Sequence, residues 1–285
     1  MYRSIRPLIF RLDPEQAHAL TVGLLRMAGS LPPIRLFLKN LFQPSRSVPV
    51  QLMGLHFPNP VGLAAGFDKD GESWRGLAAL GFGHLELGTV TPVAQPGNAK
   101  PRIFRIPDRQ ALINRMGFPG KGASFLIDQL ERQEADRSNR DFILGLNIGK
   151  NKQTSNQAAV GDYLQLLQTF QRKVDYYAVN VSSPNTEGLR RLQAREHLEE
   201  LVSSLVRERD LLMKEGEGSL PIVVKLSPDL TDQGLDDALE ALIAGGADGV
   251  IATNTTLSRE GVTGEAAREA GGLSGVPLRE RSTRM

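Results

Sequence analysis

Six short apolar runs, each ending in polar or glycine-rich residues, constrain this fold more than any other feature of the sequence. Helical patterns such as 196–214 and 233–244 separate most of the runs. Near-continuous apolar strands that alternate with helices predict a parallel sheet covered by helices. Polar residues after every strand favour a barrel over a two-sided dinucleotide-binding sheet, and no GxGxxG motif follows the first strand. The runs with their polar ends span 61–71, 83–92, 142–151, 176–186, 221–230 and 249–256.

The length of the chain suits one main domain of the α/β class. An eight-stranded barrel of the TIM type takes about 250 residues, and the chain has 285. Only six strands can be identified, and the sequence ends at PLRERSTRM, where a helix would begin. We therefore expect a (β/α)8 TIM barrel over 47–285 that is incomplete at its C-terminus by roughly a quarter. A two-helix extension, 1–46, would precede it.

The predicted extension differs from the rest of the chain in charge. It carries seven Arg or Lys and two acids, a net charge of +5 in a chain whose total is +2. Asp13, Pro14 and Glu15 are typical of a helix start, and Pro32 opens a second amphipathic helix. The pattern fits a helical hairpin that caps the barrel. It also fits a module on an anionic membrane surface that guides an apolar molecule inward, and the charge favours this interpretation.

Composition excludes several classes of protein. The sequence has no cysteine, which excludes disulfides, thiolate metal sites, iron–sulfur clusters and a cysteine base. The net charge of +2 argues against a dedicated nucleic-acid binder. No apolar run approaches the roughly 18 residues that cross a bilayer, and the N-terminus does not match a signal peptide. We expect no metal site, and a location in the cytoplasm or on the cytoplasmic side of a membrane.

Two stretches concentrate polar side chains at predicted strand ends. The run 176–186, YYAVNVSSPNT, ends in a turn that includes Asn180 and Ser183. The segment 92–141 is too long for a simple connection, so we expect a hairpin excursion over the barrel mouth that carries the loop LINRMGF, 112–118. In isolation, the serine and the asparagines would be ordinary turn residues.

Eight motifs in order match one family. The chain resembles the class 2, quinone-dependent dihydroorotate dehydrogenases over essentially all of its 285 residues. A helical leader and a serine at the base position are similar to class 2, whereas class 1 enzymes have a cysteine there. The motifs are GLAAGFDKDGE (62–72), GTVTPVAQPGN (88–98), LINRMGF (112–118), NIGKNK (147–152), NVSSPNT (180–186), VKLSPDL (224–230), ATNTTLSR (252–259) and GGLSG (271–275).

The resemblance implies oxidation of dihydroorotate to orotate in pyrimidine biosynthesis, with FMN as cofactor and a membrane quinone as electron acceptor. One ring carbon would lose a proton to an enzyme base while its neighbour passes a hydride to FMN. The resemblance makes Ser183 this base, Thr186 a partner in the proton relay and Phe118 the shield of that path. Because a neutral serine is a poor base, its own proton must leave through hydrogen bonds.

The resemblance also implies the ligand contacts. Asparagine suits the amide edges of the substrate because it both donates and accepts. Lys225 is a lysine inside an apolar strand, and beside the flavin it would stabilise negative charge on the reduced ring. The substrate contacts would be Lys69, Asn114, Arg115, Met116, Gly117, Phe118, Asn180, Asn185, Asn254 and Thr255. The flavin contacts would be Ala65, Gly66, Phe67, Asp68, Lys69, Thr89, Asn147, Asn180, Lys225, Thr253 and Gly275.

In the same resemblance His18 and Arg105 match residues of the quinone site. The implied protein is a monomer, peripheral to the cytoplasmic face of the cell (inner) membrane, without a nucleic-acid partner. Two alternatives stay open on the sequence alone. One is a soluble FMN barrel with another electron acceptor, and the other is an inactive remnant or a membrane-surface binding protein.

Overall fold

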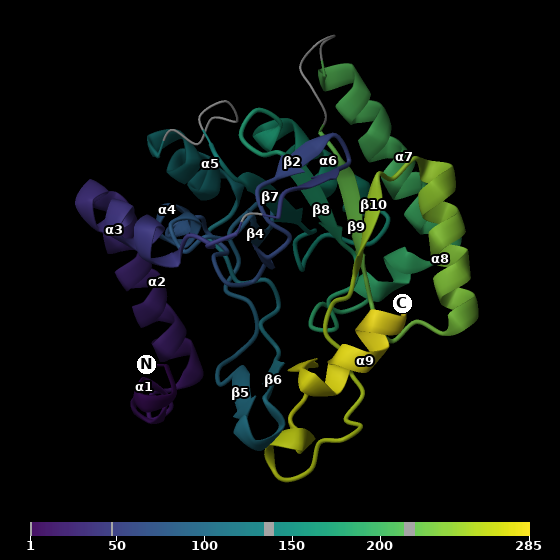
Figure 1. Cartoon of the computed structure of the whole chain (residues 1–285). Helices are drawn as coiled ribbons and strands as arrows, with labels where there is room; N and C mark the ends of the chain where they lie inside the picture. The colour runs from purple at the N-terminus through teal and green to yellow at the C-terminus, as the bar shows by residue number, and fades with distance from the viewer. Residues whose placement is uncertain (1, 47, 134–139, 214–219) are drawn as a thin grey trace.

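The computed structural model describes residues 2–46, 48–133, 140–213 and 220–285. Its main sheet has six strands, all parallel, in the order β10-β9-β8-β7-β4-β3 (Figure 1). Strands that follow one another along this sheet also follow one another in sequence, as in a barrel. The six predicted runs each form one strand: β3 (Gly62–Leu63), β4 (His84–Val90), β7 (Ile143–Ile148), β8 (Tyr176–Asn180), β9 (Ile222–Leu226) and β10 (Gly249–Ala252).

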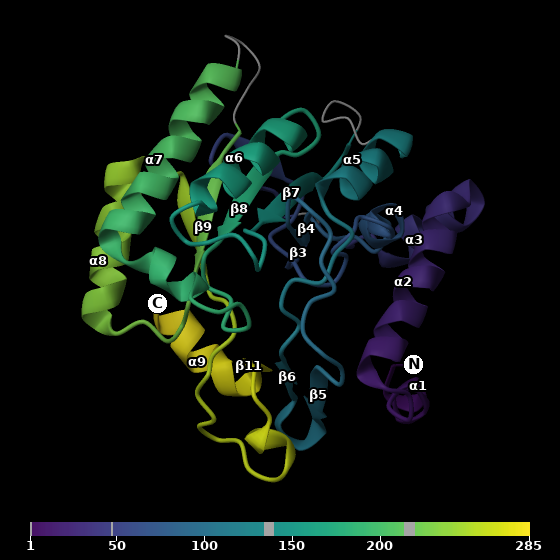
Figure 2. The ribbon, with the colours of Figure 1, turned by 180° about the vertical axis from the view of Figure 1, so that it is seen from behind.

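Helices cover the outer face of this sheet, and the parallel α/β architecture expected from the sequence is confirmed. In Figures 1 and 2, α7 and α8 lie on the side of the molecule away from the N-terminal helices. The covering helices are α4 (Trp74–Ala78), α5 (Ala123–Arg132), α6 (Ala159–Phe170), α7 (Arg195–Leu212) and α8 (Asp232–Gly245). The last helix, α9 (Val276–Arg284), lies below the sheet in Figure 1. Single 3-10 turns are η1 (Pro107–Arg109), η3 (Leu189–Gln193) and η4 (Ala266–Arg268).

Strand β8 shows how the alternation of side chains builds two cores. Tyr177 packs into the large cluster beneath the helices, and its hydroxyl donates to the Leu167 carbonyl at 2.8 Å. Tyr176 points to the opposite face and packs with Leu55 and Phe57 inside the barrel. Leu55 and Phe57 both belong to β2 (Leu55–Phe57), which pairs antiparallel with β1 (Val50–Leu52) in a hairpin that the sequence analysis did not include.

The predicted excursion is confirmed as a hairpin. β5 (Ile103–Ile106) and β6 (Ala111–Asn114) pair antiparallel below the main sheet in Figure 1. A third strand, β11 (Gly272–Gly275), pairs with β6 and was not predicted. No strand was predicted there because GGLSG, five residues with three glycines, carries no strand periodicity. The family resemblance placed Gly275 of this segment at the flavin instead.

The N-terminal extension consists of three helices, one more than expected. α2 (Pro14–Ser30) begins where predicted, because the Asp13 carboxylate accepts hydrogen bonds from the N–H groups of Glu15 (2.9 Å) and Gln16 (3.1 Å). α3 (Pro32–Phe42) follows directly. The additional helix is α1 (Tyr2–Ile9), which was missed because Pro7 lies inside it.

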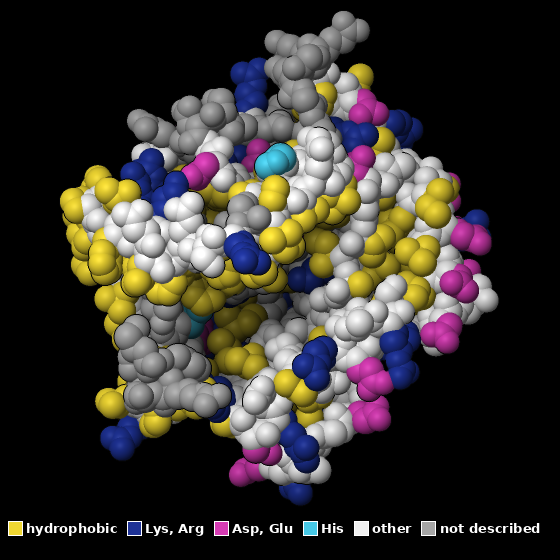
Figure 3. Space-filling view, in the orientation of Figure 1, with side chains coloured by type: hydrophobic (Ala, Val, Ile, Leu, Met, Phe, Trp, Pro, Cys, Tyr) yellow, Lys and Arg dark blue, Asp and Glu magenta, His cyan; other side chains and the backbone are white. Residues whose placement is uncertain are grey.

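Apolar side chains remain exposed on α2 and α3. Figure 3 shows hydrophobic side chains gathered over these helices, at the left of the molecule. Phe37 keeps 63% and Leu41 59% of their surface exposed. None of the helices in the described ranges is both long and apolar enough to cross a membrane.

Glycines allow α2 to cross α4 at very short distance, which leads to a prediction. A Cβ atom at Gly76 would lie 2.1 Å from the Leu25 carbonyl oxygen, whereas a Cβ at Gly23, also in α2, meets nothing within 4 Å. Gly76→Ala should therefore lower the free energy of unfolding by about 1–3 kcal/mol through overpacking. Gly23→Ala should raise it by about 0.5–1 kcal/mol, because alanine favours the helix. Urea titration measures both, and equal effects of the two changes would contradict the close crossing.

Candidate active site

A cavity of about 590 Å³ opens at the carboxyl ends of the main strands, between α2 and the β5–β6 hairpin. Figure 3 shows the molecule hollowed in this region. Eighteen of the 23 residues implied by the sequence line this cavity. They are His18, Ala65, Gly66, Phe67, Lys69, Thr89, Arg105, Asn114, Met116, Gly117, Phe118, Asn180, Ser183, Asn185, Lys225, Thr253, Asn254 and Thr255.

Asn180 is the centre of a buried hydrogen-bond network at the floor of the cavity. Its amide donates to Thr89 Oγ1 and Asn147 Oδ1, both at 3.0 Å. Its side-chain oxygen, Oδ1, accepts a hydrogen bond from the side-chain amide of Asn254 at 3.1 Å. Three strand ends, those of β4, β7 and β8, and the segment after β10 are thereby held in one arrangement. Every amide in this network has a partner, so the network fixes side-chain orientations before any ligand binds.

The network ends on a buried carboxylate that the sequence analysis missed. Glu86 accepts hydrogen bonds from the Asn147 amide (2.9 Å) and the Tyr176 hydroxyl (3.0 Å). The pKa of Tyr176 is raised well above its ordinary value by burial and by this carboxylate, which keeps the hydroxyl a donor. A charged residue in the middle of the apolar run 83–92 was the available signal, since buried acids are rare without partners.

The turn after β8 brings Ser183 and two asparagines to the cavity. Ser183 is 5% exposed, and its Oγ accepts from the Asn185 N–H at 3.2 Å. The Asn185 amide donates to Asn114 Oδ1 at 3.2 Å, which joins this turn to the end of β6. A hydroxyl and two amide groups from different elements therefore converge on one wall of the cavity.

Two lysines line the cavity, Lys69 from the loop after β3 and Lys225 from β9. Lys69 donates to the Gly66 carbonyl at 2.6 Å, and burial lowers the pKa of its ammonium group. Lys225 lies on β9 in register with Asn180, and within the described residues no ion pair engages it. The two lysines thus add positive charge among amide, hydroxyl and apolar groups, which suits an anionic ligand.

His18 and Arg105 join the N-terminal helices to the cavity. His18 Nε2 lies 2.7 Å from the Phe67 carbonyl oxygen, and burial lowers the pKa of the imidazole. Arg105 donates to the Leu12 carbonyl at 2.9 Å and lies over the Phe10 ring at 4.5 Å. Both side chains therefore hold the leader as well as line the cavity.

Five of the implied residues lie outside the cavity lining, for reasons visible in their contacts. The Arg115 guanidinium pairs with Glu269 at 2.5 Å and turns away. The Asp68 carboxylate accepts from the Ser73 N–H at 2.8 Å beside α4, and burial raises its pKa. Asn147 lies behind Asn180 in the network. Gly275 belongs to β11 and pairs with Ala111 of β6. Thr186 is buried, and the described structure shows no direct hydrogen bond between it and Ser183.

Arg102 is a second group that the sequence analysis missed. Its guanidinium is buried and pairs with both carboxylate oxygens of Glu15 on α2, at 2.7 and 3.2 Å. It also donates to the Asn98 carbonyl at 2.9 Å. The Asn98 amide in turn donates to the carbonyls of Arg115 and Asn185. This bidentate ion pair ties the leader to the loops around Ser183.

A parallel α/β sheet with converging amides, a serine and two lysines at its carboxyl edge defines the TIM-barrel class of enzyme site. Within the described ranges, no group of three or more His, Asp or Glu residues could hold a metal ion.

Comparison with known proteins identifies the family. The dihydroorotate dehydrogenase family model matches residues 47–285. Dihydroorotate dehydrogenase (quinone) of Cellvibrio japonicus is 48% identical, over 99% of this chain and 80% of that protein. The enzyme of the same name from Halorhodospira halophila is 50% identical with the same coverage. Ligand-free DHODH from Eimeria tenella superposes with a TM-score of 0.83 at 40% identity, over 95% of this chain and 77% of that one. The chain belongs to the dihydroorotate dehydrogenase family, whose members are flavin-dependent oxidoreductases.

The lowered pKa of His18 predicts how pH affects stability. The unfolded imidazole titrates near 6.5 and the folded one lower, so below that pH the unfolded state binds more protons. The contribution of His18 is present above about pH 6.5 and is lost as the pH falls further. The stability lost between about pH 7.5 and 5.5 should shrink in His18→Asn, measured by urea titration. His197→Asn, at an exposed position, serves as the control, and the same loss in both variants would contradict the prediction.

Proposed function

We propose that this chain oxidises dihydroorotate to orotate and passes the electrons to a quinone, a step of pyrimidine biosynthesis. The observation that carries the proposal is the position of Ser183, beside the amides of Asn114, Asn180 and Asn185 on one cavity wall. A planar ring with amide edges can exchange hydrogen bonds with these groups in both directions. Its carboxylate would pair with Lys69, whose ammonium lines the same cavity.

Ser183 is proposed as the base that removes a proton from the ring. Ser183 is 5% exposed, which limits the contact of its hydroxyl with bulk water. The hydroxyl proton of Ser183 would pass on as the new proton arrives, with Thr186 as the proposed relay partner. Phe118 supports this arrangement, because a Cβ atom at Gly149 would lie 3.1 Å from its ring, and the ring therefore packs tightly over the end of β7. Exclusion of water keeps the transferred proton on a single path.

The cavity residues fit FMN as the flavin. Gly66 has φ +107° and open space where a Cβ would lie, so a planar ring can approach the backbone there. Thr89, Lys225 and Thr253 supply polar groups on the same floor. When bound, FMN supplies a two-electron acceptor for the hydride. The Lys225 ammonium would stabilise the negative charge that accompanies reduction.

We propose that the N-terminal helices serve the quinone. His18 and Arg105 line the leader side of the cavity and offer hydrogen bonds to a quinone headgroup. The exposed apolar side chains of α2 and α3, together with the charge of +5 over 1–46, suit the surface of an anionic membrane. We propose a monomer that is peripheral to the cytoplasmic face of the cell membrane.

Replacement of Ser183 tests the first half-reaction. Ser183→Ala should abolish flavin reduction by dihydroorotate, because the proton has no acceptor, while flavin content stays unchanged. Ser183→Cys should retain part of the rate, since a thiol is more acidic than a hydroxyl. Stopped-flow absorbance of the flavin measures both rates. A normal rate in Ser183→Ala would remove Ser183 as the base.

A blocking substitution in α2 tests the second half-reaction. Thr21 lines the leader side of the cavity, and Thr21→Phe should fill the entrance and raise the KM for quinone about tenfold or more. Flavin reduction by dihydroorotate should stay unchanged. Gln16→Phe is the matched control, because Gln16 is exposed on the same helix and does not line the cavity. Equal KM values for the two variants would contradict quinone entry along α2.

A further inference from the structure

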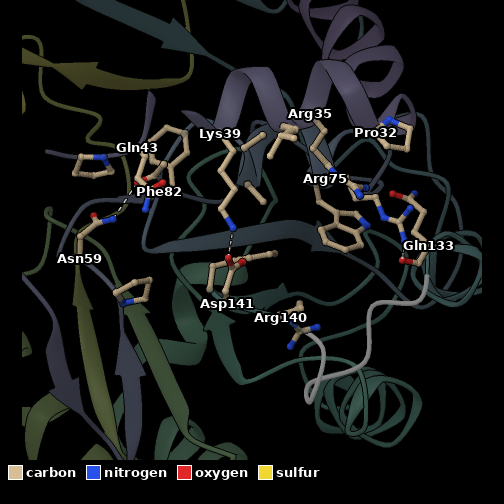
Figure 4. Close-up of a pocket in the computed structure, with 18 residues that line it drawn as sticks. Pro32, Arg35, Lys39, Gln43, Asn59, Arg75, Phe82, Gln133, Arg140 and Asp141 are labelled. Carbon is tan, nitrogen blue, oxygen red and sulfur yellow. Dashed lines mark hydrogen bonds and ion pairs between the residues drawn. The ribbon is translucent and has the colours of Figure 1, made fainter. Parts of the chain in front are cut away.

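A second cavity, of about 670 Å³, lies at the opposite edge of the main sheet (Figure 4). It is enclosed by α3, α4 and the residues that precede β4 and β7, whereas the candidate active site lies at the carboxyl ends of the strands. Its volume falls within the range of small-molecule sites. No step of the proposed reaction uses it.

Four positive side chains line this cavity. Arg35 and Lys39 come from one face of α3, and Arg75 comes from α4 (Figure 4). Arg35 contacts the Gly29 carbonyl at 3.4 Å, a long hydrogen bond, and forms no ion pair with a described residue. Lys39 reaches Asp141, the one carboxylate among the described residues of the lining, at a site where both side chains are at least half exposed.

The fourth cation, Arg140, is already engaged by protein groups. It pairs with Asp175 at 2.6 Å and donates to the Lys173 carbonyl at 2.7 Å. Arg75 donates to the Gln133 carbonyl and lies over the Trp74 ring at 5.6 Å. Among the described residues of the lining, Arg35 and Lys39 against Asp141 leave a net charge of +1. A phosphate monoester carries about −1.5 to −2 at neutral pH, and guanidinium groups bind phosphate oxygens in pairs.

The other wall is apolar and aromatic. Trp74 and Phe142 lie with ring centroids 5.9 Å apart, and Phe82 and Leu36 also line the cavity. Trp74 is 5% exposed, and its indole N–H has no hydrogen-bond partner among the described residues. A ligand for this cavity therefore combines an anionic head with an apolar body.

The cavity is distinct from the exposed apolar surface of the leader. At 100° per residue, Arg35 and Lys39 lie on one side of α3, whereas Ile34, Phe37 and Leu41 lie on the other. The basic side faces the barrel, and the apolar side faces solvent. This placement favours a small molecule over a membrane surface as the occupant.

We propose that the cavity between α3 and α4 binds an organic phosphate, with the phosphate on Arg35 and Lys39 and the apolar body against Trp74 and Phe142. On binding, the phosphate replaces Asp141 as the ion-pair partner of Lys39. The proposal is independent of the proposed reaction, because none of these residues lines the active-site cavity.

Trp74 is the single tryptophan of the chain, so its fluorescence reports on this cavity directly. Titration of the purified protein with phenyl phosphate should give a saturable fluorescence change, with a Kd confirmed by calorimetry. Inorganic phosphate, which lacks the apolar body, and phenol, which lacks the charge, should each bind at least about tenfold more weakly. The natural ligand could be a lipid or a soluble organic phosphate. Dihexanoyl phosphatidic acid, a water-soluble lipid that also carries a phosphate monoester, distinguishes these two sources. Tighter binding of this lipid identifies a lipid ligand, and tighter binding of phenyl phosphate identifies a soluble one.

Matched variants decide whether the signal belongs to the cavity. Arg35→Gln and Lys39→Gln should each weaken phenyl phosphate binding about tenfold, since each removes a charged hydrogen bond. Arg11→Gln removes the same charge from an exposed position of the leader outside the lining and should leave the Kd unchanged. Circular dichroism verifies that all three variants fold. No saturable binding, or equal Kd values in the Arg35 and Arg11 variants, would overturn the proposal.

Discussion

Hydrogen bonding between polar side chains buried at the ends of parallel strands is the interaction on which the rest of this structure depends. A buried amide without a partner costs free energy, so Asn180, Thr89 and Asn147 can occupy the sheet interior only by satisfying one another. Their chain of contacts ends on Glu86, a carboxylate shared by an amide and a tyrosine hydroxyl. The same contacts fix the groups that face the cavity. Stability and pre-organisation of the site therefore have one physical cause.

The N-terminal helices are joined to this site by two different kinds of contact. Arg102 is a buried cation held by Glu15 and by backbone carbonyls, and its replacement by a neutral side chain would leave the Glu15 carboxylate with only the exposed Lys100 as an ion-pair partner among the described residues. The glycines at the α2–α4 crossing allow close backbone approach, which packs the helix without any specific pair. A leader attached in this way can shape one wall of the cavity while its apolar side chains stay exposed. That division is consistent with the proposal that one substrate comes from solution and the other from a membrane.

Sequence reasoning succeeded where the signal is local. The six strands follow from apolar runs, and the start of α2 follows from Asp13 and Pro14. Most residues implied by the family resemblance line one cavity, and their roles in binding and catalysis stay predictions. It failed where the cause lies in a distant partner. β11 forms because β6 is beside it, and Arg115 leaves the cavity because Glu269 attracts its guanidinium. Arg102 was missed for the same reason, since its partner Glu15 lies 87 residues away.

The sequence by itself determined the parallel α/β class, the strand order and the set of chemical groups at the strand ends. Apolar periodicity and turn chemistry encode these features within a few residues of each other. Only the tertiary structure decided which of those groups share a cavity and which serve the framework. Asp68 caps a turn, Asn147 supports Asn180, and the basic face of α3 closes a second cavity against α4. These outcomes depend on packing between segments far apart in sequence, where distance and desolvation, and not residue type, select the partner.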